Sequence, residues 1–283
     1  MDVAQLWRYP VKSMVGETVG SVELDELGIV GDRTWATRDL ERGGIRGAKK
    51  IGALMTLGAR DLGDGHVEIT LPDGTTVTTD DPDVHERVSL AVGHPVHLEP
   101  LRPEDDLDHY RRGAPDSDDM LVELRAVMGR EEGEPLPDFS KLPPTLAEFE
   151  SPPGTYHDVF PLLVITTSAL AALGRALPGS NVDVRRFRPS IVVDNGDDGL
   201  HASTPGHPEF DWAGRRATLG SATIEFTVPC PRCVMVTREV APSIPADPAV
   251  LRHIVADLHQ DLGVYATVVT PGTVTVGDRL ELR

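Results

Sequence analysis

Apolar and polar residues alternate in short runs along the first third of the chain. An alternation of period two predicts half-buried β-strands rather than helices. The last two of these runs are joined by Pro72-Asp73-Gly74, which is typical of a hairpin turn. We therefore expect a β-dominated N-terminal domain over residues 1–103. Its predicted strands cover residues 3–9, 19–24, 34–38, 66–71 and 75–79.

After residue 155 the strand-like runs are interrupted by two segments with a helical period. The first helix is predicted to begin at a cap at Thr166 or Thr167, with leucines at 170, 173 and 177 on one face. The second is predicted to have Asp247 as its N-cap and Pro248 in its first turn, and to end before Gly263. This mixture indicates an α+β, β-rich domain over residues 156–283, a barrel or strongly bent sheet with flanking helices. Its predicted strands cover residues 162–166, 190–193, 217–228, 234–237, 264–270 and 273–282.

An acidic, proline-rich segment separates the two regions, and we interpret residues 104–155 as a linker with one helix. Residues 104–150 contain fourteen Asp or Glu against five Lys or Arg. The helix is predicted to start from Ser117 as N-cap and to end at Gly129. The acidic residues are typical of a solvated surface. A docking patch for a basic redox partner is the alternative.

Composition excludes several classes of function. The chain has 283 residues, is 40% hydrophobic and carries a net charge of -18, which disfavours binding of nucleic acid through the general surface. No apolar run approaches the roughly 20 residues that span a bilayer. We therefore expect a protein of the cytoplasm without a membrane anchor.

The only two cysteines lie three residues apart, in Pro229-Cys230-Pro231-Arg232-Cys233. We expect this segment to form a turn between the strands at 217–228 and 234–237, which is not the helix start that a thioredoxin-like pair needs. A zinc site would need about four ligands, and the ten histidines show no matching spacing. A pair of buried thiols or a disulfide is a further possibility. Because Arg232 would favour a thiolate, Cys233 is a candidate ligand or nucleophile.

Three small groups of basic residues stand at predicted turns of this acidic chain. They are Arg8 with Lys12-Ser13, then Gly31-Asp32-Arg33, and then the segment 185–189. Lys, Arg and Ser on such turns can bind phosphate or carboxylate groups through charge-assisted hydrogen bonds. The alternative is that they pair with the abundant surface carboxylates.

Taken together and in order, these motifs resemble the MOSC family, the molybdenum cofactor sulfurase C-terminal domain proteins. The resemblance covers nearly the whole chain outside the linker and includes an N-terminal MOSC β-barrel domain followed by a MOSC-type β-barrel with flanking helices. By layout the chain is similar to the mitochondrial amidoxime-reducing component and its bacterial counterparts. The motifs that carry the resemblance are Tyr9-Pro10-Val11-Lys12-Ser13, Gly31-Asp32-Arg33, Phe187-Arg188-Pro189, Cys230-Pro231-Arg232-Cys233 and the segment 271–278.

The resemblance implies roles for particular residues. Cys233 corresponds to the cysteine that ligates molybdenum, as a soft thiolate beside the pterin dithiolene. Cys230 is then a buried thiol next to the ligand. His157 and Asp158, in a segment that approaches the cofactor in relatives, could move protons. The alternative is that His157 is an ordinary capping or surface histidine. The residues expected to hold the phosphorylated pterin or to line its pocket are Lys12, Ser13, Arg33, Arg188, Arg232 and Tyr265.

The function implied by the resemblance is that of a molybdenum-pterin oxidoreductase. It would reduce N-hydroxylated compounds of the amidoxime, hydroxylamine or N-oxide type by removing an oxygen atom at a Cys-ligated molybdenum. An iron–sulfur domain would need four more cysteines, so we expect electrons to arrive from a separate flavin, iron–sulfur or haem reductase. The alternative is a carrier of sulfur or of the molybdenum cofactor without turnover. A third possibility is a family member that has lost the cofactor and binds another anion.

Overall fold

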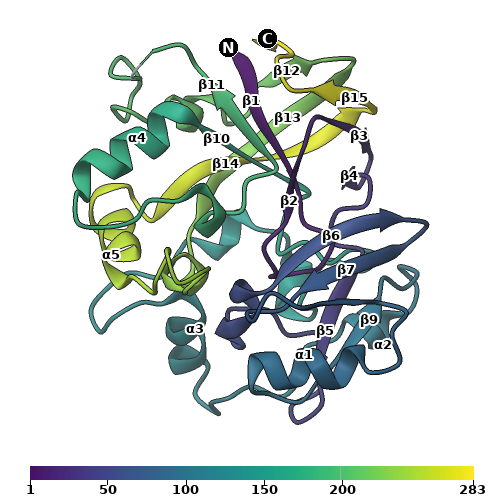
Figure 1. Cartoon of the computed structure of the whole chain (residues 1–283). Helices are drawn as coiled ribbons and strands as arrows, with labels where there is room; N and C mark the ends of the chain where they lie inside the picture. Colours follow the sequence, from purple (N-terminus) through teal and green to yellow (C-terminus); the bar gives the residue numbers. More distant parts are fainter. Residues whose placement is uncertain (198) are drawn as a thin grey trace.

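A computed structural model describes residues 1–197 and 199–283 and confirms the predicted β-rich α+β class. Figure 1 shows an upper part built on one long sheet, with α4 (Thr167–Ala176) and α5 (Pro248–Asp257) beside it. The lower part contains smaller sheets and α1 (Val84–Val92). Among the described residues, no helix has both the length and the apolar character needed to cross a membrane.

The long sheet joins the two ends of the sequence. In the part of the chain that the structure describes, eight strands pair in the order β16-β12-β13-β14-β10-β11-β1-β2. The pair β10–β11 is parallel and is connected through α4, and the other pairs are antiparallel. The strands are β1 (Asp2–Arg8), β2 (Glu17–Val19), β10 (Leu162–Thr166), β11 (Ile191–Asp194), β12 (Arg216–Leu219), β13 (Ala222–Pro231), β14 (Asp261–Thr270) and β16 (Leu280–Leu282). The N-terminal strand β1 therefore completes a sheet that otherwise comes from the C-terminal half.

Across the described residues, three smaller sheets accompany the long sheet. Strand β15 (Gly272–Thr275) pairs with β3 (Ser21–Asp25), which pairs with β4 (Gly28–Ile29). In the lower part, β5 (Trp35–Asp39) pairs with β9 (Val96–Pro100), and β6 (Gly58–Gly63), β7 (His66–Thr70) and β8 (Thr76–Thr78) form a meander. Val67, Ile69 and Val88 are buried in this lower core, and so is Met235 from the C-terminal half. The two parts thus share both a sheet and a core.

The predicted helices form close to their expected positions because their caps are local. Thr166 caps α4 through Ala169 N, and Asp247 caps α5 through Ala249 N. The linker helix α3 (Met120–Met128) is capped by Asp119 rather than Ser117, because the Asp119 carboxylate accepts the amides of residues 121 and 122. The remaining short helices are η1 (Gly52–Thr56), α2 (Leu107–Tyr110), η2 (Phe139–Lys141), η3 (Pro144–Ala147), η4 (Val184–Arg186), η5 (Pro208–Trp212) and η6 (Val234–Thr237).

The predicted strand over 234–237 is wrong, because these residues form the 3-10 helix η6. Neighbouring side chains of the Val-Met-Val sequence in η6 pack into two different cores. Met235 is buried in the lower core, and Val236 is buried in the core beneath α5. The cysteine segment is consequently not a turn between strands. Pro231 still pairs with Asp261 at the end of β13, and Cys233 then begins η6.

Other boundaries also differ from the sequence-based expectation. The predicted strand 217–228 is a hairpin of β12 and β13, in which Gly220 has a φ of 57°. The predicted strand 273–282 is divided into β15 and β16. The predicted strand 19–24 includes the end of β2 and most of β3. Helix α1 and strands β6 and β9 were not predicted. The spacing of Val84, Val88 and Val92, which α1 buries, is the helical signal that could have revealed it.

Candidate functional site

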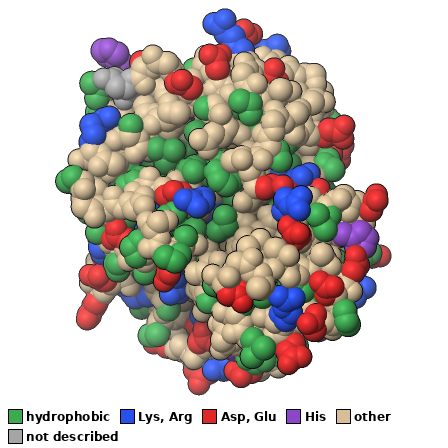
Figure 2. Space-filling model, viewed as in Figure 1, with side chains coloured by type: hydrophobic (Ala, Val, Ile, Leu, Met, Phe, Trp, Pro, Cys, Tyr) green, Lys and Arg blue, Asp and Glu red, His purple; other side chains and the backbone are tan. Residues whose placement is uncertain are grey.

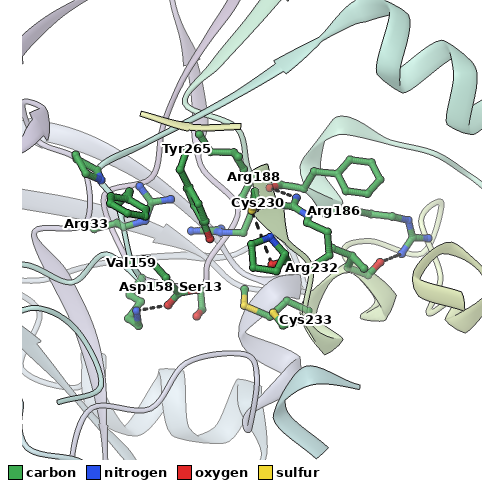
Figure 3. Close-up of a pocket in the computed structure, with 18 residues that line it drawn as sticks. Ser13, Arg33, Asp158, Val159, Arg186, Arg188, Cys230, Arg232, Cys233 and Tyr265 are labelled. Atoms are coloured by element: carbon green, nitrogen blue, oxygen red, sulfur yellow. Dashed lines mark hydrogen bonds and ion pairs between the residues drawn. The ribbon is translucent and has the colours of Figure 1, made fainter. Parts of the chain in front are cut away.

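One cavity between the upper and lower parts is lined by Cys233 and by all six residues expected to hold or surround the pterin. Lys12 and Ser13 follow β1, Arg33 follows β4, and Arg188 precedes β11. Arg232 and Cys233 follow β13, and Tyr265 lies on β14. Figure 3 shows Arg33 and Asp158 on one side of the cavity, with Arg232 and Cys233 on the other. Only the tertiary structure brings these turns together.

Three of the lining residues have a strained backbone. Ser13, Arg33 and Arg188 have φ values of 72°, 50° and 54°, in the left-handed region that side chains other than glycine disfavour. Such conformations cost free energy and persist where surrounding structure enforces them, often at functional sites. Their concentration around one cavity supports a binding role for it.

The buried Tyr9 ring supports two of the cations. The Arg188 guanidinium lies 4.2 Å from the ring centroid, and that of Arg33 lies 5.3 Å away. The Tyr9 hydroxyl donates to the carbonyl oxygen of Pro189 over 2.9 Å. Burial raises the Tyr9 pKa, so the phenol stays neutral. Asp32 accepts the Tyr9 amide at 2.6 Å and pairs with Arg33.

Two guanidinium groups in the cavity have buried donors without acceptors. Within the residues that the structure describes, Arg188 Nη2 and Arg232 Nε have no hydrogen-bond partner. Arg188 Nη1 donates to Met14 O, and Arg232 Nη2 donates to Phe187 O over 2.6 Å. Burial and the neighbouring Arg33 lower the pKa of Arg188 to about 10, which still leaves it charged at neutral pH. Buried cationic donors are normally satisfied, so these two indicate a place for an anion.

Lys12, in contrast, already has three acceptors. Its Nζ donates to Ser151 Oγ at 3.2 Å, to Tyr156 O at 2.9 Å and to Asp158 Oδ1 at 2.5 Å. An ammonium group has three donors, so none is left for a ligand in this arrangement. Lys49 also approaches Asp158, at 3.5 Å. Burial acts to raise the Asp158 pKa, but the two lysines outweigh it and hold that pKa well below its usual value.

The two cysteines differ in environment, and both are free thiols rather than a disulfide. Cys230 is 1% exposed, and its sulfur accepts a hydrogen bond from Arg232 Nη1 over 3.0 Å. Burial raises the Cys230 pKa, which favours the thiol form. Cys233 is half-buried and lines the cavity. No cluster of three or more potential metal ligands among His, Cys, Asp and Glu occurs in residues 1–197 and 199–283.

The remaining candidates have separate positions. The Tyr265 ring lies 5.3 Å from that of Phe160 at the cavity wall. His157 is buried and contacts Leu27 O through Nε2 at 2.9 Å, and it is not among the lining residues. Burial and Arg33 lower the His157 pKa to about 3, so it is neutral at physiological pH. This geometry gives no support to the idea that His157 moves protons for the site.

Several residues that shape the site could not be identified as site residues from the sequence. Tyr9 belongs to one of the sequence motifs, but its stacking against Arg33 and Arg188 could not be read from the motif. Lys49 has no feature in the sequence, apart from its charge, that marks it as a site residue. Arg130 is 6% exposed and donates to the carbonyl of Arg232 over 3.0 Å. Its position directly after Gly129, the expected helix end, was its only sequence signal.

The comparisons with known proteins agree with this architecture. The MOSC N-terminal beta barrel domain matches residues 1–99, and the MOSC domain matches residues 152–281. The chain therefore belongs to the MOSC domain proteins. The MOSC domain is associated with binding of the molybdenum cofactor. No curated protein matches the chain.

The solved structures that match the chain are distant in sequence. The YuaD protein of Bacillus subtilis is 13% identical, with a TM-score of 0.43 over 99% of this chain and 94% of that one. YiiM of Geobacillus stearothermophilus is 15% identical, with a TM-score of 0.32 over 44% of this chain. YiiM of Escherichia coli is 16% identical, with a TM-score of 0.29 over 47% of this chain. The match spans only 54% and 58% of the two YiiM chains.

Proposed function

We propose that this protein is a molybdenum cofactor-dependent oxidoreductase that reduces N-hydroxylated compounds of the amidoxime, hydroxylamine or N-oxide type. The observation that carries the proposal is the cavity itself. It combines two buried guanidinium donors, on Arg188 and Arg232, that have no acceptor among the described residues, with the half-buried free thiol of Cys233. An anionic, phosphorylated pterin with a thiolate-ligated metal matches this combination of cations and sulfur.

The donor set fits the cofactor in chemical terms. Cys233 would ligate the metal, and Arg33, Arg188 and Arg232 would bind the anionic pterin. Ser13 would contribute its hydroxyl hydrogen, because its Oγ already accepts the Ala48 amide at 2.9 Å. Lys12 would act mainly by positioning the 151–158 segment, and Tyr265 would form the wall. When bound, the cofactor supplies the two-electron chemistry that removes an oxygen atom from the substrate.

The protein's own contribution is position and charge. Two protons and two electrons are needed to release the oxygen as water, and the electrons would come from a separate reductase with a flavin, iron–sulfur or haem group. Because burial keeps His157 neutral, we assign the protons to solvent that reaches the cavity rather than to that imidazole.

The first test is the molybdenum and pterin content of protein made in a host that synthesises the cofactor. We expect near-stoichiometric metal in the wild type and a loss of metal in Cys233→Ser, with reduction of an amidoxime by a chemical electron donor only in the wild type. Cys230→Ser is the matched control and should keep its metal. Bound cofactor or labile sulfur on Cys233 without turnover would favour a carrier. A well-folded wild type without metal, pterin or labile sulfur on Cys233 would contradict both functions.

A further inference from the structure

The acidic linker contributes one buried cation to the cysteine segment. Arg130 is 6% exposed and directly follows α3 and Gly129. Gly129 has a φ of 63°, and a Cβ atom there would lie 3.1 Å from Val234 Cα and 2.7 Å from Leu251 Cδ2. The glycine thus lets the end of α3 approach η6, one residue beyond Cys233. This close approach places Arg130 against the cysteine segment.

The guanidinium of Arg130 makes hydrogen bonds in three directions. Nη2 donates to Arg232 O over 3.0 Å. Nε and Nη2 both reach Gln260 Oε1, at 3.1 Å and 3.0 Å. Nη1 donates to Met128 O and so closes the turn at the end of α3. A buried cation with this many acceptors is held in one orientation.

Gln260 completes the arrangement from the other side. Its backbone oxygen accepts the Arg232 amide over 2.8 Å, while its side chain accepts from Arg130. His259 and Gln260 have φ values of 53° and 76° and are two consecutive left-handed residues after Leu258, the C-cap of α5. Strain of this kind is retained where the surroundings require the conformation. The amide and the carbonyl of Arg232 are therefore both bonded to the Arg130–Gln260 pair.

We propose that Arg130 and Gln260 form a clamp that fixes the peptide between Arg232 and Cys233, and with it the direction of the Cys233 thiol in the cavity. The carbonyl of Arg232 belongs to that peptide and accepts a hydrogen bond from Arg130. This contact therefore prevents rotation of the peptide plane. Arg130 is on this view a positioning residue that the linker supplies to the site. The consequence for cofactor binding rests on the proposed function, but the clamp itself does not.

The clamp is tested by hydrogen exchange of the Arg232 amide, followed by NMR on the full chain. Arg130→Met keeps the length of the side chain but removes its donors. We expect the Arg232 amide to exchange at least about tenfold faster, because a charge-assisted bond to a neighbouring group is lost. The amide of Phe226 in β13, which donates to Arg215 O over 2.9 Å, serves as the internal reference and should not change.

Arg112→Met is the matched control variant. Arg112 is another linker arginine, but it is half-exposed and donates to Leu146 O and Glu150 within the linker itself. It should leave Arg232 exchange at the wild-type rate. Arg130→Lys should restore exchange only in part, because one ammonium cannot contact Arg232 O and Gln260 Oε1 with the same fork. The double variant with Gln260→Met should be no faster than the more affected single variant, since the two residues act as one unit.

The second measurement is molybdenum per chain after gel filtration. We expect Arg130→Met to retain less metal than both the wild type and Arg112→Met. An unchanged Arg232 exchange rate in Arg130→Met would overturn the clamp. Faster exchange with undiminished metal would show that the Arg130 contacts only fasten the linker to the cysteine segment, and it would overturn the positioning role of Arg130.

A wild type without metal or pterin would contradict the proposed function. The exchange rates of the Arg232 amide would then decide by themselves whether the clamp exists. If Arg130→Met does not fold, Gln260→Met is measured in its place with the same criteria.

Discussion

Tyr9 holds Arg188 from two sides. Its ring lies beneath the guanidinium at 4.2 Å, and its hydroxyl donates to the carbonyl of Pro189, the residue that follows Arg188. The strained φ of 54° at Arg188 is thus supported by a contact with the side chain and a hydrogen bond to the adjoining backbone. Tyr9, which directly follows the first strand of the chain, thereby orients a cation that lies far away in the sequence.

Replacement of Tyr9 should weaken anion binding without unfolding the protein. We expect Tyr9→Leu to lower retention of the cofactor about tenfold, the scale of a desolvated cation–π contact together with one hydrogen bond. Tyr9→Phe keeps the ring and should show a smaller loss. The measurement is pterin content after gel filtration, with the melting temperature followed in parallel. Equal retention in Tyr9→Leu and the wild type would show that the ring does not support Arg188.

Asp261 should make stability depend on pH in a defined direction. Burial raises its pKa to about 6, and the residue lies beside the cysteine segment, paired with Pro231. A carboxyl whose pKa is raised in the folded state contributes stability below its unfolded pKa of about 4 and loses that contribution as pH rises through about 6. Asp261→Asn should therefore match the wild type near pH 4 and exceed its free energy of unfolding by about 3 kcal/mol at pH 7.5.

The check on Asp261 is a series of urea unfolding curves for both proteins between pH 4 and pH 8. A difference that stays constant over this range would mean that the carboxyl titrates normally in the folded state.

Gly129 should tolerate no side chain, for two separable reasons. Its φ of 63° disfavours any other residue, and a Cβ would lie 2.7 Å from Leu251 Cδ2. Gly133, in the same linker, has a φ of 86°, but apart from its chain neighbours no atom of the described residues lies within 4 Å of its Cβ position. Gly133→Ala should cost about 1 kcal/mol from the backbone alone, and Gly129→Ala should cost clearly more. Equal melting temperatures for the two variants would argue against close packing of α3 on η6.

The two halves of the chain should not fold separately. Strand β1 pairs with β11 and carries β2 at the edge of the long sheet, and Met235 is buried in the lower core. Residues 152–283 alone would expose the edge of β11 and lose that burial. We expect this fragment to give no cooperative thermal transition by circular dichroism, whereas a chain nicked within the linker should stay associated. A fragment that unfolds cooperatively and retains pterin would contradict this expectation.

Local chemistry made some elements predictable from sequence. Thr166 and Asp247 cap their helices through amides two or three residues away, so no distant contact is needed to define α4 and α5. The cysteine pair and the basic turns were likewise recognisable, because rare thiols and cations in a chain of charge -18 stand out. Helix α1 shows a local signal that was overlooked rather than absent.

Other features depend on partners that sequence spacing cannot specify. Val234–Thr237 has the composition of a strand but forms a helix, because Met235 and Val236 are buried in different cores. Lys12 looked like a free phosphate ligand, yet Ser151, Tyr156 and Asp158 already accept its hydrogens.

By itself the sequence determined which chemistry is available: one thiol pair, a few cations at turns, and the MOSC motifs that carry them. Only the tertiary structure decided which of these groups lie together and which are already satisfied. The physical reason is that hydrogen bonding and burial are set by neighbours distant along the chain. In the part of the chain that the structure describes, Arg188 therefore keeps an unpaired donor in the cavity, while Arg130, in an acidic linker, is buried against the carbonyl of Arg232.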